Sequence, residues 1–123
     1  LRQVGQRFSR EIRHEDIAAR YGGDEFIVII TNLDLALDLA KEKAGAISRR
    51  LKNALTRPYC LGAHTVNVTV SAGVRLFPDN LNDTADSVLQ SADQALYAAK
   101  AGGRNQIRFS GGVLCADGPD LTG

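Results

Sequence analysis

The sequence has little of several features that mark specialised proteins. Its two cysteines, Cys60 and Cys115, lie far apart and in no metal-ligand spacing, so the thiols indicate neither a zinc module nor a disulfide scaffold. The formal net charge is only +1, so no global field draws the chain to nucleic acid or to a membrane. No apolar run is long enough to span a bilayer, and no signal peptide is visible. We therefore expect a cytoplasmic domain, and any membrane anchor of the protein should lie outside these residues.

The residues that are present predict one α/β domain. The chain has 123 residues, of which 44% are hydrophobic. This length suffices for one domain with a hydrophobic core and is too short for two domains. We expect an α+β sandwich: a mostly antiparallel sheet flanked by helices. Residues 1–109 should form the domain, and the glycine-rich residues 110–123 a linker or disordered tail. Periodicity predicts helices over 1–12, 33–57 and 84–101, and strands over 16–20, 26–31, 65–76 and 105–109.

Several of these elements carry more detailed expectations. The strand over 26–31 is apolar at consecutive positions, which predicts burial on both faces. Thr31 or Asn32 should cap the helix that follows. Residues 65–76 alternate between apolar and polar side chains, as in one continuous strand with a single buried face. Tyr97 lies beside the apolar stripe of the last predicted helix, so we expect it in the core.

The stretch RYGGDEFIVII, at residues 20–30, places two glycines and two acids between the first two predicted strands. Gly22 and Gly23 can take a positive φ at little steric cost and let another molecule approach the backbone. Asp24 and Glu25 supply carboxylates, which Mg²⁺ would bridge to a phosphate. The alternative is an ordinary hairpin turn with two solvated acids.

Three sequence blocks favour the metal–phosphate site over an ordinary hairpin turn, because together they match one protein family in the same order. GGDEF at residues 22–26, VTVSAGVRLFP at 68–78 and SADQALYAAKAGGRNQI at 91–107 resemble the GGDEF family, the diguanylate cyclases. The resemblance implies the fold of the palm of nucleotide cyclases and polymerases. It also implies a reaction in which two GTP molecules, one in each subunit of a homodimer, form cyclic di-GMP and release two pyrophosphates. Mg²⁺ or Mn²⁺ would be the cofactor, and nucleic acid would not be a partner.

The resemblance also implies roles for individual residues. By position in the motif, Asp24 should bind the metal, and Glu25 should assist the metal or the attacking hydroxyl. The nucleotide would lie against Gly22 and Gly23. The terminal phosphates would be held by Lys100 and Arg104, although two basic residues near a helix C-terminus would also favour the helix dipole without any ligand.

An arginine and an aspartate upstream of the signature resemble a second site of the family. Arg13 and Asp16 match its RxxD inhibitory site, which binds the product cyclic di-GMP. A guanidinium can fork onto a phosphate, and a carboxylate can accept from the N–H groups of guanine. The alternative is a surface ion pair without a ligand.

The sequence departs from the family at its beginning. The family opens with a DxLTGLxNR-like segment and a first strand that carries a metal-binding aspartate, and this first strand is absent from the chain. We therefore expect the parent protein to be an active cyclase and the 123 residues alone to be inactive. The alternative function is an inactive GGDEF-type module that senses cyclic di-GMP or GTP. Attached sensory or phosphodiesterase domains are expected in either case.

Overall fold

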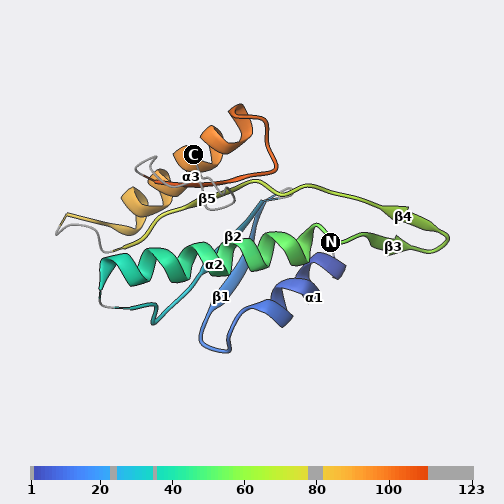
Figure 1. Cartoon of the computed structure of the whole chain (residues 1–123), viewed down its shortest axis with the longest axis horizontal. Coiled ribbons are helices and arrows are strands. Elements are labelled where there is room, and N and C mark those ends of the chain that lie inside the picture. Colours follow the sequence, from blue (N-terminus) through green and yellow to red (C-terminus); the bar gives the residue numbers. More distant parts are fainter. Residues whose placement is uncertain (1, 23–24, 35, 78–81, 111–123) are drawn as a thin grey trace.

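The computed structural model of the chain describes residues 2–22, 25–34, 36–77 and 82–110 (Figure 1). No helix within these ranges is both long enough and apolar enough to cross a membrane. The elements are α1 (Arg2–Glu11), β1 (Ile17–Gly22), β2 (Glu25–Ile29), α2 (Leu37–Leu55), β3 (Tyr59–Leu61), β4 (His64–Val66), β5 (Ala72–Val74), α3 (Ala85–Ala101) and β6 (Ile107–Phe109).

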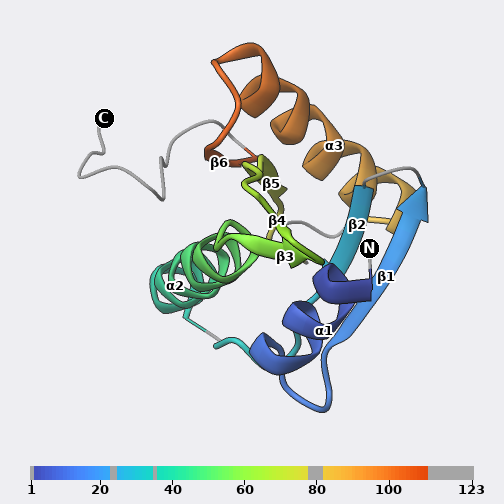
Figure 2. The same cartoon turned by 90° about the vertical axis from the view of Figure 1, so that its right-hand side faces the viewer.

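The strands associate in pairs. β1 with β2 and β3 with β4 are antiparallel hairpins, whereas β5 and β6 are parallel. The β5–β6 pair lies between α2 and α3, and α1 packs beside α2 (Figures 1 and 2). The predicted α+β architecture with mostly antiparallel pairing is thus confirmed.

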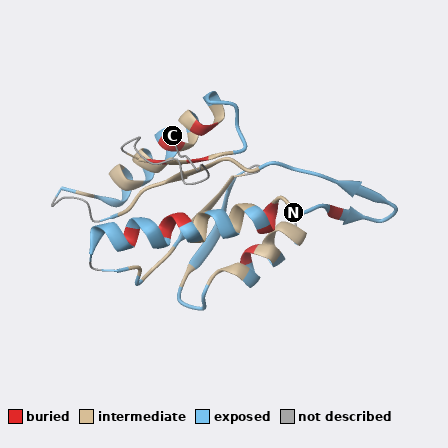
Figure 3. Ribbon diagram, viewed as in Figure 1, coloured by how far each residue is buried: buried red, intermediate tan, exposed pale blue. Residues whose placement is uncertain are grey.

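The core forms where β6 meets α2. Ile107 is fully buried and packs with Phe109 and with Ala44 of α2. Partly buried apolar residues of β5 and of the segments that follow β5 and β2 complete the cluster: Leu33, Ala72, Val74 and Leu76. The buried positions of α2 recur along one side of the helix, as in an amphipathic helix that packs on a core (Figure 3).

A close backbone contact fixes α3 on β5. A Cβ atom built on Gly73 would lie 2.2 Å from the carbonyl oxygen of Ala92 and 2.3 Å from the amide nitrogen of Leu96. Both atoms belong to the helix backbone, so neither can rotate away. Only glycine at position 73 allows this approach of strand and helix.

The strand predicted over residues 65–76 is interrupted. β4 ends at Val66 and β5 begins at Ala72, and residues 67–71 between them belong to no strand. The two pieces have different partners, because β4 pairs with β3 and β5 with β6. Val66 and Val68 are exposed, so the alternation of apolar and polar side chains in this segment does not correspond to a buried strand face.

Three further expectations were wrong. α2 begins at Leu37 with Ala36 as N-cap residue, not after Thr31 or Asn32, and Asn32 has a φ of 56°. β2 is half-buried at best, because its second edge pairs with no strand in the part of the chain that the structure describes. The Tyr97 side chain is not in the core: the residue is 75% exposed.

Candidate functional site

The signature sequence lies at the tip of the β1–β2 hairpin. Gly22 is the last residue of β1 and pairs with Glu25, the first residue of β2. Gly23 and Asp24 connect them and lie outside the described residues. Gly22 has no positive φ, so of the two predicted reasons for a glycine there the conformational one does not apply. A Cβ at Gly22 would meet nothing within 4 Å, which leaves this side of the strand open.

Glu25 and Lys100 come together although they are far apart in the sequence. Lys100 Nζ lies 3.5 Å from Glu25 Oε2, and their side chains are 34% and 41% exposed. Lys100 is in the last turn of α3, so this ion pair joins the end of α3 to the hairpin tip. An exposed ion pair contributes little to stability, about 0–1 kcal/mol, so its main consequence is to place a cation beside the signature.

The end of α3 is a Schellman motif. The Arg104 amide donates to the carbonyl of Ala99 at 2.9 Å, and the Gly103 amide to the carbonyl of Lys100 at 3.3 Å. Gly103 has a φ of 116°, which favours glycine. This motif ends the helix and turns the chain immediately before Arg104.

Arg104 therefore lies beyond the helix, not within its last turn. Its φ is 62°, a left-handed value that is uncommon for residues other than glycine. The next residue is anchored, because the Asn105 amide donates to Ser71 Oγ at 3.0 Å. The Arg104 side chain is exposed and makes no ion pair within the described ranges. The helix-dipole explanation thus applies to Lys100 and not to Arg104.

The donor set at the hairpin tip fits a hard divalent cation. Glu25 presents a partly exposed carboxylate, and the sequence places the carboxylate of Asp24 next to it. Mg²⁺ usually keeps several waters and binds through one or two carboxylates plus the phosphates of a substrate. Within the described ranges there is no cluster of three or more potential ligands.

Arg13 and Asp16 are joined in a compact network at the other end of the hairpin. Asp16 Oδ2 accepts from the Arg13 amide at 2.9 Å and faces Arg13 Nε at 3.5 Å. Asp16 Oδ1 accepts from the Thr31 amide at 3.0 Å, and Arg13 Nη2 donates to the Thr31 carbonyl. The network therefore fastens the turn before β1 to the segment after β2.

The two charged side chains of this network differ in access. The Asp16 side chain is 2% exposed, whereas that of Arg13 is 45% exposed. Burial acts to raise the pKa of Asp16, but the hydrogen bonds from Thr31 and Arg13 and the Arg13 charge outweigh it and lower that pKa below 3.8. Asp16 is thus a buried structural carboxylate, and Arg13 is the member of the pair that a ligand can reach.

The residue that sequence reasoning missed is Thr31. Its part in the network follows from the hairpin register, in which Ile17 pairs with Ile29 and the flanking residues are brought near each other. The signature and the Arg13–Asp16 pair then lie at opposite ends of a six-residue strand. At about 3.3 Å per residue they are about 20 Å apart, so the two groups of residues do not meet in one place.

Comparisons with known proteins agree with these features. The family "Diguanylate cyclase, GGDEF domain" matches residues 1–106. Diguanylate cyclase A of Treponema denticola is 33% identical over 111 residues, which are 89% of this chain and 28% of that protein. The uncharacterized protein YhcK of Bacillus subtilis is 37% identical over 112 residues, 89% of this chain and 29% of that protein. The chain thus spans less than a third of these relatives.

Solved structures show the same fold. The GGDEF domain of YfiN (TpbB) from Pseudomonas aeruginosa matches with a TM-score of 0.78 and 29% identity, over 88% of this chain and 64% of that one. The GGDEF domain of DgcB from Caulobacter crescentus, solved in complex with c-di-GMP, matches with a TM-score of 0.67 and 28% identity, over 89% of this chain and 62% of that one. The chain belongs to the GGDEF domain family of diguanylate cyclases.

Proposed function

We propose that this chain is part of an active diguanylate cyclase, which condenses two GTP molecules into cyclic di-GMP. The observation that supports this best is the intact signature at residues 22–26, with Lys100 beside Glu25. The two adjacent carboxylates of the signature are the groups that would hold a metal ion against the phosphates of GTP. Relatives named as diguanylate cyclases support the same activity.

The proposed chemistry is in-line nucleotidyl transfer between two subunits. The 3′-oxygen of one GTP attacks the α-phosphorus of the other, loses its proton, and forms the new P–O bond as pyrophosphate leaves. The reciprocal attack closes the ring and releases the second pyrophosphate. Bound Mg²⁺ or Mn²⁺ would neutralise charge on the phosphates and on the attacking oxygen. Each subunit holds one GTP, so the reaction requires a homodimer.

The residues of the hairpin tip and of the α3 terminus share this task. Asp24 and Glu25 hold the metal, and the open side of Gly22 admits the nucleotide. Lys100 and Arg104 bind the β- and γ-phosphates. Lys100 contacts Glu25 in the structure. With metal and substrate bound, Lys100 would instead pair with the phosphates, and the Glu25 carboxylate would be available to hold the metal.

Product inhibition would act at the far end of the hairpin. The exposed Arg13 guanidinium makes the direct contact with a cyclic di-GMP phosphate. The oxygens of Asp16 are already engaged and buried, so Asp16 acts as a positioning residue that holds Arg13 and the turn. Bound product would lock two domains in a pose in which their GTP sites do not meet.

The alternative is a binding or regulatory module without cyclase activity. The relative NbdA of Pseudomonas aeruginosa, 35% identical, is named a cyclic di-GMP phosphodiesterase. The chain spans only 13% of it, so other domains account for most of that protein. A module of this kind would bind cyclic di-GMP or GTP and regulate an attached phosphodiesterase domain.

Product analysis distinguishes the two functions. The intact protein that contains these residues is incubated with GTP and Mg²⁺, and cyclic di-GMP and pyrophosphate are quantified by chromatography. The cyclase predicts both products, with two pyrophosphates for each cyclic di-GMP. Nucleotide binding without either product would instead favour the regulatory module.

A further inference from the structure

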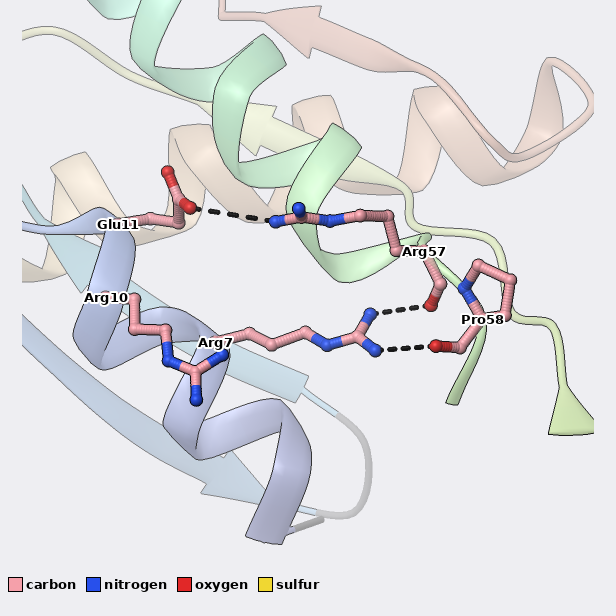
Figure 4. A pocket seen from close by; sticks show the side chains of 5 residues that line it. All are labelled: Arg7, Arg10, Glu11, Arg57 and Pro58. Carbon is pink, nitrogen blue, oxygen red and sulfur yellow. Dashed lines mark hydrogen bonds and ion pairs between the residues drawn. The ribbon is translucent and has the colours of Figure 1, made fainter. Parts of the chain in front are cut away.

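A hollow of about 360 Å³ lies between α1 and the chain that follows α2 (Figure 4). It shares no residue with the signature, with the α3 terminus or with the Arg13–Asp16 pair. We call it the arginine pocket, after three of the five residues that line it: Arg7, Arg10, Glu11, Arg57 and Pro58.

Arg7 forms a fixed wall of the arginine pocket. Its guanidinium donates to the carbonyls of Ala54 at 2.9 Å, Arg57 at 2.6 Å and Pro58 at 2.7 Å. It also lies 3.7 Å from the centre of the Tyr59 ring. These contacts hold the chain after α2 against α1 and set the distance between the two sides of the pocket.

The single acid of the pocket is shared by two cations. Glu11 Oε1 lies 3.2 Å from Arg50 Nε, and Glu11 Oε2 lies 3.8 Å from Arg57 Nη2. One carboxylate is therefore paired with two guanidinium groups, which leaves a net positive charge. The charge of Arg57 in particular is only partly compensated, because 3.8 Å is long for an ion pair and the Arg57 side chain is 66% exposed.

Arg10 carries a charge that no described residue pairs with. It is exposed, and within the described ranges its side chain makes no hydrogen bond or ion pair. Figure 4 draws no interaction between Arg10 and the other four residues, whereas Arg57 is linked both to Glu11 and to Arg7, and Arg7 also to Pro58. The arginine pocket thus combines a rigid frame with a surplus of positive charge.

We propose that the arginine pocket binds a phosphate group, with Arg10 and Arg57 as its direct ligands and Arg7 as the residue that keeps the pocket open. Guanidinium groups on two different elements can each donate a forked pair of hydrogen bonds to phosphate oxygens. The group can be inorganic phosphate or a phosphate monoester. This site would operate whether or not the domain is a cyclase.

Thermal-shift titration of the intact protein tests the proposal, because a ligand that binds only the folded state raises the melting temperature in a saturable way. Inorganic phosphate and glycerol 3-phosphate are titrated separately, with sodium chloride at matched ionic strength as reference. Saturation by both indicates recognition of the phosphate group, and saturation by one alone identifies the source. The proposal would be overturned if neither ligand raised the melting temperature in a saturable way beyond the effect of sodium chloride.

Variants show where the ligand binds. Arg10→Gln removes a side chain that has no partner among the described residues, so the variant should fold normally. It should nevertheless weaken binding at least tenfold, as should Arg57→Gln. Arg2→Gln, also exposed on α1, is the matched control and should bind like the wild type. Unchanged binding in both Arg10→Gln and Arg57→Gln would refute the site. A loss confined to Arg13→Ala would also refute it, because the ligand would then occupy the Arg13–Asp16 site.

Discussion

Lys100 Nζ lies 3.5 Å from Glu25 Oε2, so the last turn of α3 meets the first residue of β2 at the tip of the signature hairpin. This contact brings together a predicted phosphate ligand and a predicted metal ligand from segments far apart in the sequence. Arg104 follows directly, because the Schellman motif turns the chain there. The ion pair thus places one charge of each sign beside the signature, and the chain continues from Lys100 to Arg104 through this turn.

The first prediction concerns Arg104. Its replacement by alanine should weaken GTP binding at least tenfold and GMP binding little, because only GTP carries phosphates that reach beyond the α3 terminus. The magnitude corresponds to about 1.5–3 kcal/mol for a hydrogen bond to a charged group. Calorimetric titration of the intact protein with both nucleotides measures it. Lys41→Ala, at an exposed position of α2, is the charge-loss control. An equal loss for GTP and GMP would argue against a phosphate contact.

The second prediction separates the product site from the catalytic site. Arg13→Ala should leave the initial rate close to normal, because Arg13 lies about 20 Å from the signature. It should abolish the slowing of the reaction as cyclic di-GMP accumulates. Progress curves with and without added product measure both effects. If Arg13→Ala is inhibited as strongly as the wild type, the network at residues 13–16 serves structure alone.

The third prediction follows from the lowered pKa of Asp16. A carboxylate with a depressed folded-state pKa stabilises the fold above its unfolded value, near 3.8, and this stabilisation is lost as the pH falls through the lower folded value. Asp16→Asn should cost about 1.5–3 kcal/mol of unfolding free energy at neutral pH. The difference from the wild type should shrink below about pH 4. Denaturant unfolding across this range measures it, and a difference independent of pH would contradict the ionised network.

The fourth prediction tests the packing of α3 on β5. Gly73→Ala places a methyl group against helix backbone and should destabilise the domain by about 1–3 kcal/mol or more. Gly5→Ala is a matched control, because a Cβ at Gly5 in α1 meets nothing within 4 Å. That control should be neutral or stabilise by about 0.5–1 kcal/mol, since alanine favours a helix. The melting temperature should therefore fall in Gly73→Ala and stay equal or rise in Gly5→Ala. Equal changes of the melting temperature in both variants would contradict the close contact at Gly73.

The sequence predicted the elements that have a strong local pattern. α3 begins after Thr84 as expected, because Thr84 and Ser87 form a capping box, and it ends at the expected glycines. The hairpin of β1 and β2 was equally clear from its turn. Residues 65–76 were misread, because alternation records side-chain polarity and not the presence of a partner strand. Tyr97 was misplaced because a single position beside an apolar stripe can face either the core or solvent.

For the candidate site too, the sequence predicted some features and not others. Motif spacing indicated Glu25 and Lys100, but it could not show that the two side chains meet, since that depends on how α3 packs against β5. It also could not show that the Asp16 side chain is buried and accepts a hydrogen bond from the Thr31 amide, fifteen residues away along the chain. Polarity alone suggested a solvent-exposed ligand at position 16.

The most direct measurement for the central claim is the rate of cyclic di-GMP formation by Asp24→Asn in the intact protein. The substitution keeps the size of the side chain and removes a metal-binding charge, so it should cost several kcal/mol of transition-state stabilisation and lower the rate at least a hundredfold. Asp93→Asn, at an exposed position of α3, removes an equal charge away from the signature and should retain the wild-type rate. A wild-type protein that makes cyclic di-GMP and an Asp24→Asn variant that makes it at a near-normal rate would contradict the account.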